Sequence, residues 1–265
     1  MRALLVALAA SSAVVAAARS TWSPCGLSML STITPMGERA RRYTFGGTAA
    51  WFIVGALLGG ATLGLLAASL AAGIGALDLA PATAVGAVAV LALVTAASDA
   101  QVASFRLPGH RRQVNEVWLD RYRSWVYGAG FGWQIGVGLV TFIVTASVYL
   151  TIALAALTGE PLVAFAICVG FGAARGVAVL LSRSATTVEC LQALHRRFDS
   201  LAAPSRRATI AAQLVLAAVA AVAAFGAAGG FVIALAAGAA IATVIRQERA
   251  TAPALPPSGA EVAGL

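Results

Sequence analysis

The sequence predicts an all-α fold: a polytopic bundle of about seven transmembrane helices. Of its 265 residues, 60% are hydrophobic and only 11% are charged, whereas soluble domains carry about 25% charged residues. The mean hydropathy is +0.88. Long apolar runs alternate with short polar segments; all eighteen basic residues are arginines, and most of them cluster in those segments. This arrangement is typical of an integral membrane protein whose basic loops set its orientation.

The apolar runs define the expected spans in order. Met1–Ala18 resembles a secretory signal, but its apolar character resumes after Arg19, which favours an uncleaved first helix with a break near Pro24. The last run is too long for one crossing, because a hydrocarbon core of about 30 Å accommodates roughly 20 helical residues; it is expected to hold two helices that separate at residues 227–230. The spans after the first are Phe45–Leu70, Ala82–Ala97, Tyr127–Leu157, Leu162–Leu181 and the double run Ala208–Ile245.

The arginine clusters follow spans one, three, five and seven, so all lie on one side if the N-terminus is outside and the C-terminus is cytoplasmic. The expected location is the plasma membrane. Spans one to three and four to six then run in opposite directions, as in an inverted repeat. Residues 1–249 form one expected domain, with a cytoplasmic amphipathic segment at 105–125, a cytoplasmic loop at 182–207, and a disordered tail at 250–265.

The stretch Ser20–Pro35 holds the first candidate site. Pro24 and Gly26 interrupt the first helix and leave the thiol of Cys25 at an irregular backbone, while Pro35 ends the stretch. Irregular backbone at membrane depth occurs where protein or a water-filled cavity surrounds it. The alternative is a cysteine that packs as a small hydrophobe beside a kink.

A glycine-rich lead into the fourth span forms the matching part of the second repeat. Trp133 falls opposite Trp22 when the two repeats are laid together, and Gly132 and Gly136 are candidate helix-breaking positions. Gln134 is the strongly polar residue there, either lining a polar cavity or bridging helices. The second span carries its own closely spaced glycines, which favour close packing between helices.

Arg175 lies well inside the fifth span. An intramembrane arginine is a functional candidate by default. The alternative is that its long side chain extends toward the cytoplasmic interface.

The net charge of +8 has a topological explanation, and no aromatic and basic residues interleave as in nucleic-acid-binding proteins. Three cysteines and two distant histidines form no metal-ligand spacing. We therefore expect a partner in the lipid bilayer, no nucleic-acid partner, no metal and no cofactor.

Ser23-Pro24-Cys25 followed by Pro35, and the segment FIVGALLGGATLG, resemble the cytochrome c biogenesis protein CcdA and the membrane domain of the reductase DsbD. The resemblance implies thiol–disulfide electron transfer from a cytoplasmic thioredoxin-like donor to an extracytoplasmic thiol acceptor. It implies that Cys25 is one catalytic cysteine. Gln134-Ile135-Gly136 stands where the second Pro-Cys would be, so Cys168 would have to substitute. Whether the chain is an enzyme depends on whether Cys25 has such a redox partner.

Three functions follow as hypotheses. The first is a thiol–disulfide conduit, or a degenerate relative of one. The second is a small-solute transporter or exporter on an inverted-repeat scaffold. The third is a non-catalytic membrane subunit whose Phe105–Trp125 segment binds a partner.

Overall fold

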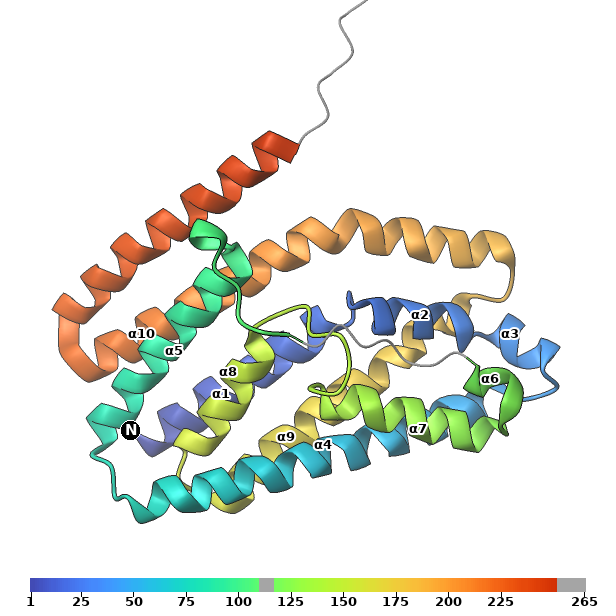
Figure 1. The fold of residues 1–265 in the computed structure, drawn as a ribbon, viewed down its shortest axis with the longest axis horizontal. Helices are drawn as coiled ribbons and strands as arrows, with labels where there is room; N and C mark the ends of the chain where they lie inside the picture. The colour runs from blue at the N-terminus through green and yellow to red at the C-terminus, as the bar shows by residue number, and fades with distance from the viewer. Residues whose placement is uncertain (110–116, 252–265) are drawn as a thin grey trace, which may run out of the picture.

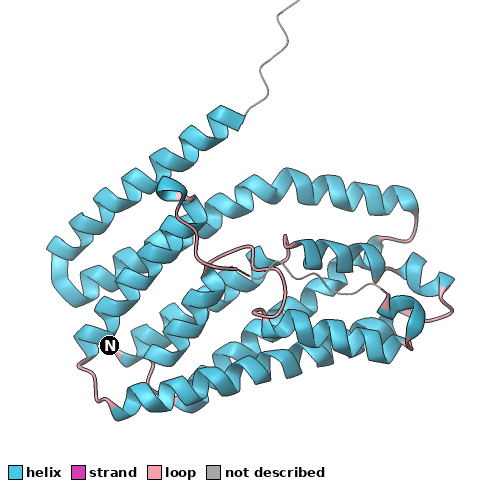
Figure 2. Ribbon diagram, viewed as in Figure 1, coloured by secondary structure: helices cyan, strands magenta, loops and turns pink. Residues whose placement is uncertain are grey.

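The structure is a computed structural model that describes residues 1–109 and 117–251 (Figure 1). Helices joined by short loops make up this part of the chain, which contains no strand (Figure 2). The predicted all-α membrane bundle is thereby confirmed. The helices are α1 Arg2–Ser20, α2 Pro24–Thr32, α3 Pro35–Ala40, α4 Phe45–Ala76, α5 Pro81–Ala100, α6 Trp118–Arg121, α7 Ser124–Val137, α8 Ser147–Leu157, α9 Pro161–Val177 and α10 Val188–Thr251, with 3-10 helices η1 Val102–Ser104 and η2 Ala178–Ser184.

Five helices of the described chain are long and apolar enough to cross a membrane: α1, α4, α5, α9 continued by η2, and the Val188–Phe231 part of α10. The predicted fourth span differs most from the structure. It consists of α7 and the 11-residue α8, with residues 138–146 non-helical between them. Gly138 begins this interruption with a φ of 74°, a left-handed conformation that suits glycine.

The predicted helix pair at 208–245 is present as two helical parts of α10 that meet at a sharp kink. Gly226 leaves the helical region with φ 69° and ψ −159°, one residue before the predicted separation at 227–230. Beyond Gly226 the chain runs back alongside the bundle (Figure 1). The polar loop expected at 182–207 is instead η2 followed by the first turns of α10. The tail from residue 252 and the centre of the expected amphipathic segment, residues 110–116, lie outside the described residues.

Local sequence explains why the first helix breaks where it does. Ser23 precedes Pro24, and its side-chain oxygen accepts a hydrogen bond from the Gly26 N–H at 3.0 Å. Thr34 and Pro35 repeat the arrangement at the start of α3, where Gly37 N–H donates to Thr34 Oγ1. A capping hydroxyl followed by proline is a strong helix-start signal, because proline has no N–H to leave unpaired.

Glycines allow α4 to pack closely between α7 and α9. A Cβ added at Gly132 would lie 2.0 Å from the Phe52 carbonyl oxygen of α4, and one at Gly172 would lie 2.7 Å from Gly60 Cα. No side chain fits at these distances, so the backbones meet directly. The glycines predicted to serve packing in the second span therefore lie in its contact faces.

The arginine-poor turns gather at one end of the bundle (Figure 1). The N-terminus lies there, and Arg2 pairs with Glu160 of the α8–α9 turn at 3.3 Å. The α4–α5 turn also lies at this end, since Gly75 packs against Gly159. The arginine-bearing segments α3, α6 and the start of α10 lie at the other end. The alternation expected of a multi-pass membrane protein is present; its sidedness in the cell stays a prediction.

Candidate functional site

Asp99, in the last turn of α5, is the centre of a buried polar cluster. Its carboxylate accepts hydrogen bonds from Thr145 Oγ1 at 2.6 Å, from the Ala146 N–H at 2.8 Å and from Gln213 Nε2 at 2.9 Å. Ala146 is the N-cap of α8. A carboxylate is favourable at this position, because the unpaired N–H groups and the dipole of a helix N-terminus are positive.

Two arginines bind the same junction from other helices. Arg206 of α10 donates from Nε and Nη2 to the Asp99 main-chain oxygen, at 3.1 and 2.9 Å. This carbonyl lies at the C-terminus of α5, where cations are favourable. Arg19, in the last turn of α1, donates to Ser205 Oγ at 3.1 Å. The ends of α1, α5 and α8 and the middle of α10 are therefore joined at one place.

The cluster continues as a line of polar side chains into the apolar core. Gln213 is 1% exposed, and its Nε2 also donates to Ser147 Oγ at 2.8 Å. Thr151 Oγ1 donates to the Ser147 carbonyl at 2.9 Å and lies 3.0 Å from Ser12 Oγ. Within the described chain, Gln213 Oε1 is a buried acceptor without a hydrogen-bond partner. Such an atom is uncommon in native proteins.

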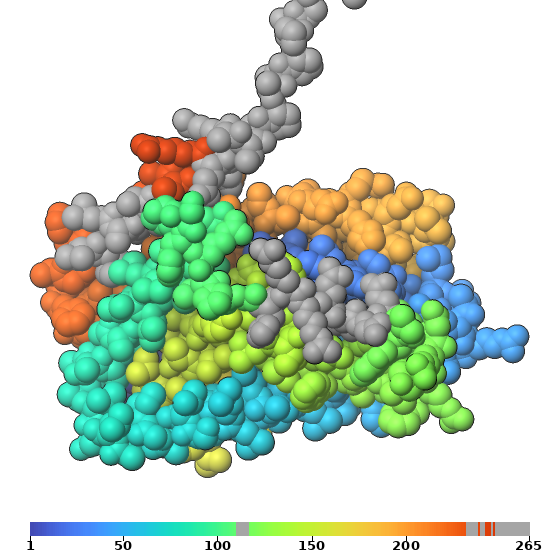
Figure 3. Space-filling view, in the orientation of Figure 1, coloured from blue at the N-terminus to red at the C-terminus, as the bar shows by residue number. Residues whose placement is uncertain are grey.

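A cavity of about 640 Å³ lies beside Asp99. The segment that follows α5 (green in Figure 3) forms part of its wall, between α10 (orange) and the residues that precede α8 (yellow-green). Among the described residues, three arginines and one aspartate line it, which gives this part of the lining a net charge of +2. The lining residues are Arg19, Ser98, Asp99, Gln101, Arg106, Leu107, Pro108, Gly109, Phe142, Ile143, Val144, Thr145, Ala146, Tyr149, Arg206 and Thr209.

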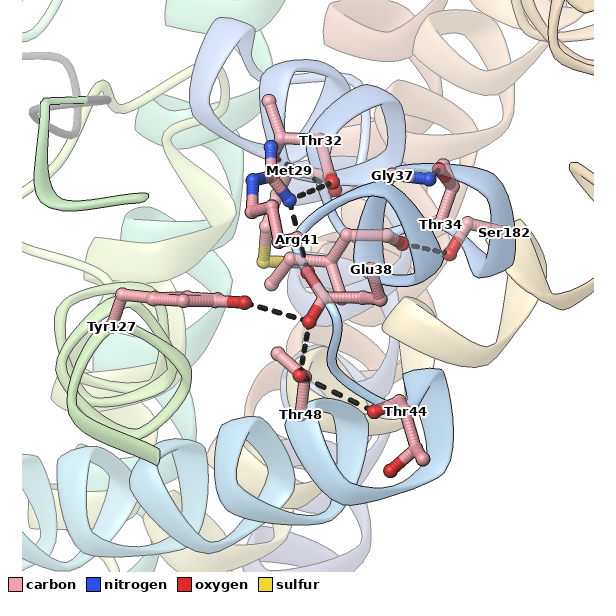
Figure 4. Close-up of polar contacts among 11 residues, drawn as sticks. Met29, Thr32, Thr34, Gly37, Glu38, Arg41, Thr44, Thr48, Tyr127 and Ser182 are labelled. Atoms are coloured by element: carbon pink, nitrogen blue, oxygen red, sulfur yellow. Dashed lines mark hydrogen bonds and ion pairs between the residues drawn. The ribbon is translucent and has the colours of Figure 1, made fainter. Parts of the chain in front are cut away.

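A second buried carboxylate, Glu38 of α3, lies elsewhere in the bundle (Figure 4). It is fully buried. It accepts hydrogen bonds from Tyr127 Oη at 2.6 Å and from the Thr48 hydroxyl, and it pairs with Arg41 at 3.0 Å. Arg41 also donates to the Thr32 carbonyl at 3.2 Å. This cluster attaches α3 to α4 and α7.

The two cysteines singled out in the sequence are both buried. Cys25 is the second residue of α2, and Cys168 lies in an apolar cluster of α9 that also includes Phe171. None of the three cysteines, all within the described chain, forms a disulfide. Cys25 is 1% exposed and Cys168 is fully buried. Catalytic roles for Cys25 and Cys168 stay predictions.

Arg175 is 4% exposed, so its side chain remains within the bundle. It donates to the Ile135 carbonyl at 2.5 Å, and its guanidinium lies 5.6 Å from the centre of the Phe171 ring. Ile135 is in the last turn of α7, where helix carbonyls have no partner within the helix. Arg175 therefore caps the broken fourth segment.

The other residues singled out in the sequence either begin a helix or pack between helices. Pro24 and Pro35 are first residues of α2 and α3, and Gly26 is buried behind Pro24. Gly132 and Gly136 lie inside α7 and face α4, and the helix ends after Val137. Gln134 is half-buried on α7.

Sequence reasoning missed the Asp99 cluster. Two signals were available. Asp99 is an acid at the end of an apolar span, and Gln213 is the strongly polar residue in the apolar run 208–245. Polar side chains inside membrane spans are costly and tend to be functional. Their convergence with Thr145 and Ser147 is a long-range property of the fold.

Comparison with known proteins finds methylamine utilization proteins named MauF. The chain is 31% identical to MauF of Paracoccus versutus over 169 residues, 62% of this chain and 60% of the relative. It is 31% identical to that of Paracoccus denitrificans over 186 residues, 67% and 64% of the two chains. It is 28% identical to that of Methylophilus methylotrophus over 193 residues, 69% and 65%. The matches thus span less than two thirds of these relatives. No family model and no solved structure matches.

These relatives correct one prediction. They are MauF proteins and not members of the CcdA and DsbD family, so the family assignment from Ser23-Pro24-Cys25 was wrong. Cytochrome c biogenesis and thiol–disulfide exchange, the functions which that assignment implied, are withdrawn with it. A serine or threonine before proline is a general helix-start signal, as Thr34-Pro35 shows in this same chain. The chain is similar to proteins of methylamine utilization and is an all-helical multi-pass membrane protein.

Proposed function

We propose that this chain is an accessory membrane protein that supports methylamine utilization. The observation that carries the proposal is the similarity to MauF proteins over more than 60% of the chain. The fold agrees with an accessory role, because five apolar helices anchor the chain in a membrane. The Asp99 cluster holds four helices together beside a cavity of ligand size.

Growth on methylamine tests this proposal. A Paracoccus denitrificans strain that lacks its own MauF would receive this chain, the native MauF or an empty vector. We expect this chain, once detected in the membrane fraction, to restore growth on methylamine as native MauF does. Growth on succinate serves as the control. A chain present in the membrane at the native level without restored growth would contradict the shared role.

A second candidate is a small-solute transporter. The specific observation in its favour is a line of hydrogen-bonded, buried polar side chains that begins at Asp99 on the cavity wall. Asp99 bonds to Gln213, Gln213 to Ser147, and Ser147 to Thr151. Polar groups in this arrangement occur along solute pathways in membrane proteins.

Thiol accessibility tests the second candidate. In a background with serine at positions 25, 168 and 190, Ser147→Cys and Thr151→Cys should react with a hydrophilic, membrane-impermeant thiol reagent if water and solute enter along this line. Leu154→Cys is the matched control, because Leu154 is fully buried on the same helix in an apolar cluster. Equal protection of all three cysteines would show a closed core and refute a pathway.

A further inference from the structure

We propose that the cavity beside Asp99 binds an anionic group of the phosphate class. Three arginines line this one cavity, and they come from three separate segments: Arg19 from the end of α1, Arg106 from the segment after α5, and Arg206 from the middle of α10. Residues so distant in sequence share a wall only in the folded chain. Arginine is suited to phosphate and carboxylate oxygens, because its planar guanidinium presents several donors in a fixed arrangement.

Asp99 offsets only one of these three positive charges. Its carboxylate already accepts hydrogen bonds from Thr145, Ala146 and Gln213, and its acceptor positions are directed toward α8 and α10. With one negative and three positive side chains, the lining keeps a net charge of +2. A cation would therefore meet net repulsion in this cavity, whereas an anion would be attracted.

Neutral hydrogen-bonding groups complete the wall. Thr209 and Tyr149 line the same cavity, and the Tyr149 hydroxyl donates to the Pro108 carbonyl at 2.6 Å. Apolar side chains such as Phe142 and Ile143 line another part. A wall with clustered positive charge and an apolar portion fits a ligand that has an anionic head attached to a less polar body.

The positions of Arg19 and Arg206 relative to the apolar spans indicate two possible sources of the anion. Arg19 directly follows the apolar part of α1, and Arg206 directly precedes the apolar run that begins at Ala208. Both lie at the boundary where membrane helices meet phospholipid headgroups. The anion is therefore either a lipid phosphate or a soluble phosphate-bearing molecule that enters from the aqueous side.

This inference deepens the second candidate function, since it names a ligand class for the same cavity. It is tested by binding to the purified full chain, so its failure is distinguishable from a failure to support growth on methylamine. A failure to bind anions is also distinguishable from the lack of a solute pathway, because an anion can bind in the cavity without crossing the core.

The probes are inorganic phosphate and phosphatidylglycerol, with phosphatidylcholine as the lipid that carries no net charge. Binding to the detergent-solubilised chain would be measured by native mass spectrometry for the lipids and by calorimetry for phosphate. Arg106→Gln is the primary variant, because Arg106 is exposed and its replacement spares the packed core. Arg19→Gln is the second variant. Arg183→Gln removes the same charge from an exposed position outside the lining and is the matched control.

We expect the wild-type chain to bind at least one anionic probe, and Arg106→Gln and Arg19→Gln each to weaken that binding by about tenfold, which corresponds to one charged hydrogen bond. Arg183→Gln should leave it within about twofold, as expected for a distant, screened charge. Displacement of phosphatidylglycerol by phosphate identifies a site for soluble anions, and binding of phosphatidylglycerol alone identifies a lipid site. The proposal is overturned if neither probe binds better than phosphatidylcholine or chloride, or if all three variants weaken binding equally.

Discussion

Two carboxylates within the bundle, Glu38 and Asp99, have similar chemistry and different surroundings. Each accepts three hydrogen bonds or ion-pair contacts, and each joins helices that are distant in sequence. Glu38 is fully buried, with Arg41, Thr48 and Tyr127 around it. Asp99 is half-buried and belongs to the wall of a 640 Å³ cavity.

The difference shows how a carboxylate that stabilises the fold is distinguished from one that lies at a ligand-binding site. The oxygens of Glu38 are directed at three donors of the fold, one of them an arginine that balances the charge. Around Asp99 the arginines approach the main chain and the cavity, while neutral groups bind the carboxylate. We therefore assign stability to the Glu38 cluster and ligand binding to the surroundings of Asp99.

Glu38→Gln should have the largest effect on stability. The substitution leaves Arg41, whose side chain is 25% exposed, without its partner in a buried environment. Breaking a buried ion pair costs about 3–5 kcal/mol, and the partial exposure of Arg41 favours the lower end of that range. Unfolding in mixed micelles with increasing dodecyl sulfate would measure it. Glu160→Gln, which breaks the exposed pair with Arg2, is the control and should change stability little. If the two substitutions lowered stability equally, the assignment of a stabilising role to Glu38 would be wrong.

Asp99→Asn should destabilise the chain by less, roughly 1–2 kcal/mol. Neutral groups bind this carboxylate, and an amide oxygen in the place of Oδ2 can still accept from Thr145 and Gln213. The same change removes the negative charge of the cavity wall. Binding of the phosphate probe should therefore strengthen by a few fold, whereas Glu38→Gln should leave it unchanged. Weaker phosphate binding in Asp99→Asn would contradict the assignment of the cavity to anions.

Tyr127→Phe should cost about 1 kcal/mol, since it removes one hydrogen bond to Glu38 at 2.6 Å and leaves the ring packing in place. The same unfolding titration measures it. In the double variant with Glu38→Gln the two losses should not add, because both remove the same contact. Full additivity would show that Tyr127 stabilises α7 independently of Glu38.

Gln213→Leu should have the smallest effect, below about 1 kcal/mol. It removes the hydrogen bonds to Asp99 and Ser147, but it also removes Oε1, a buried acceptor without a partner in the described chain. A loss of stability as large as that of Glu38→Gln would mean that a water molecule or ligand donates a hydrogen bond to Gln213 Oε1 in the membrane.

The sequence predicted much of the fold and little of the candidate site. Apolar runs located α1, α4, α5 and α9, and the break expected near Pro24 is present between α1 and α2. The break in the fourth span was expected at Gly132 and Gly136 but begins at Gly138, because hydropathy and glycine content do not report backbone conformation. The segment 182–207 was identified only as a polar loop between spans, and polarity alone does not tell that residues from Val188 onward form a helix.

By itself the sequence determined that the chain is an arginine-rich, all-helical membrane protein, because hydropathy and charge placement act locally along each segment. Only the tertiary structure decided which polar residues meet. Arg175 of α9 donates to the Ile135 carbonyl at the end of α7, and Asp99 gathers Thr145, Gln213 and Arg206 beside a cavity. These contacts depend on how α1, α5, α7, α8, α9 and α10 pack, and the glycines and small residues that set such packing look alike in every apolar run.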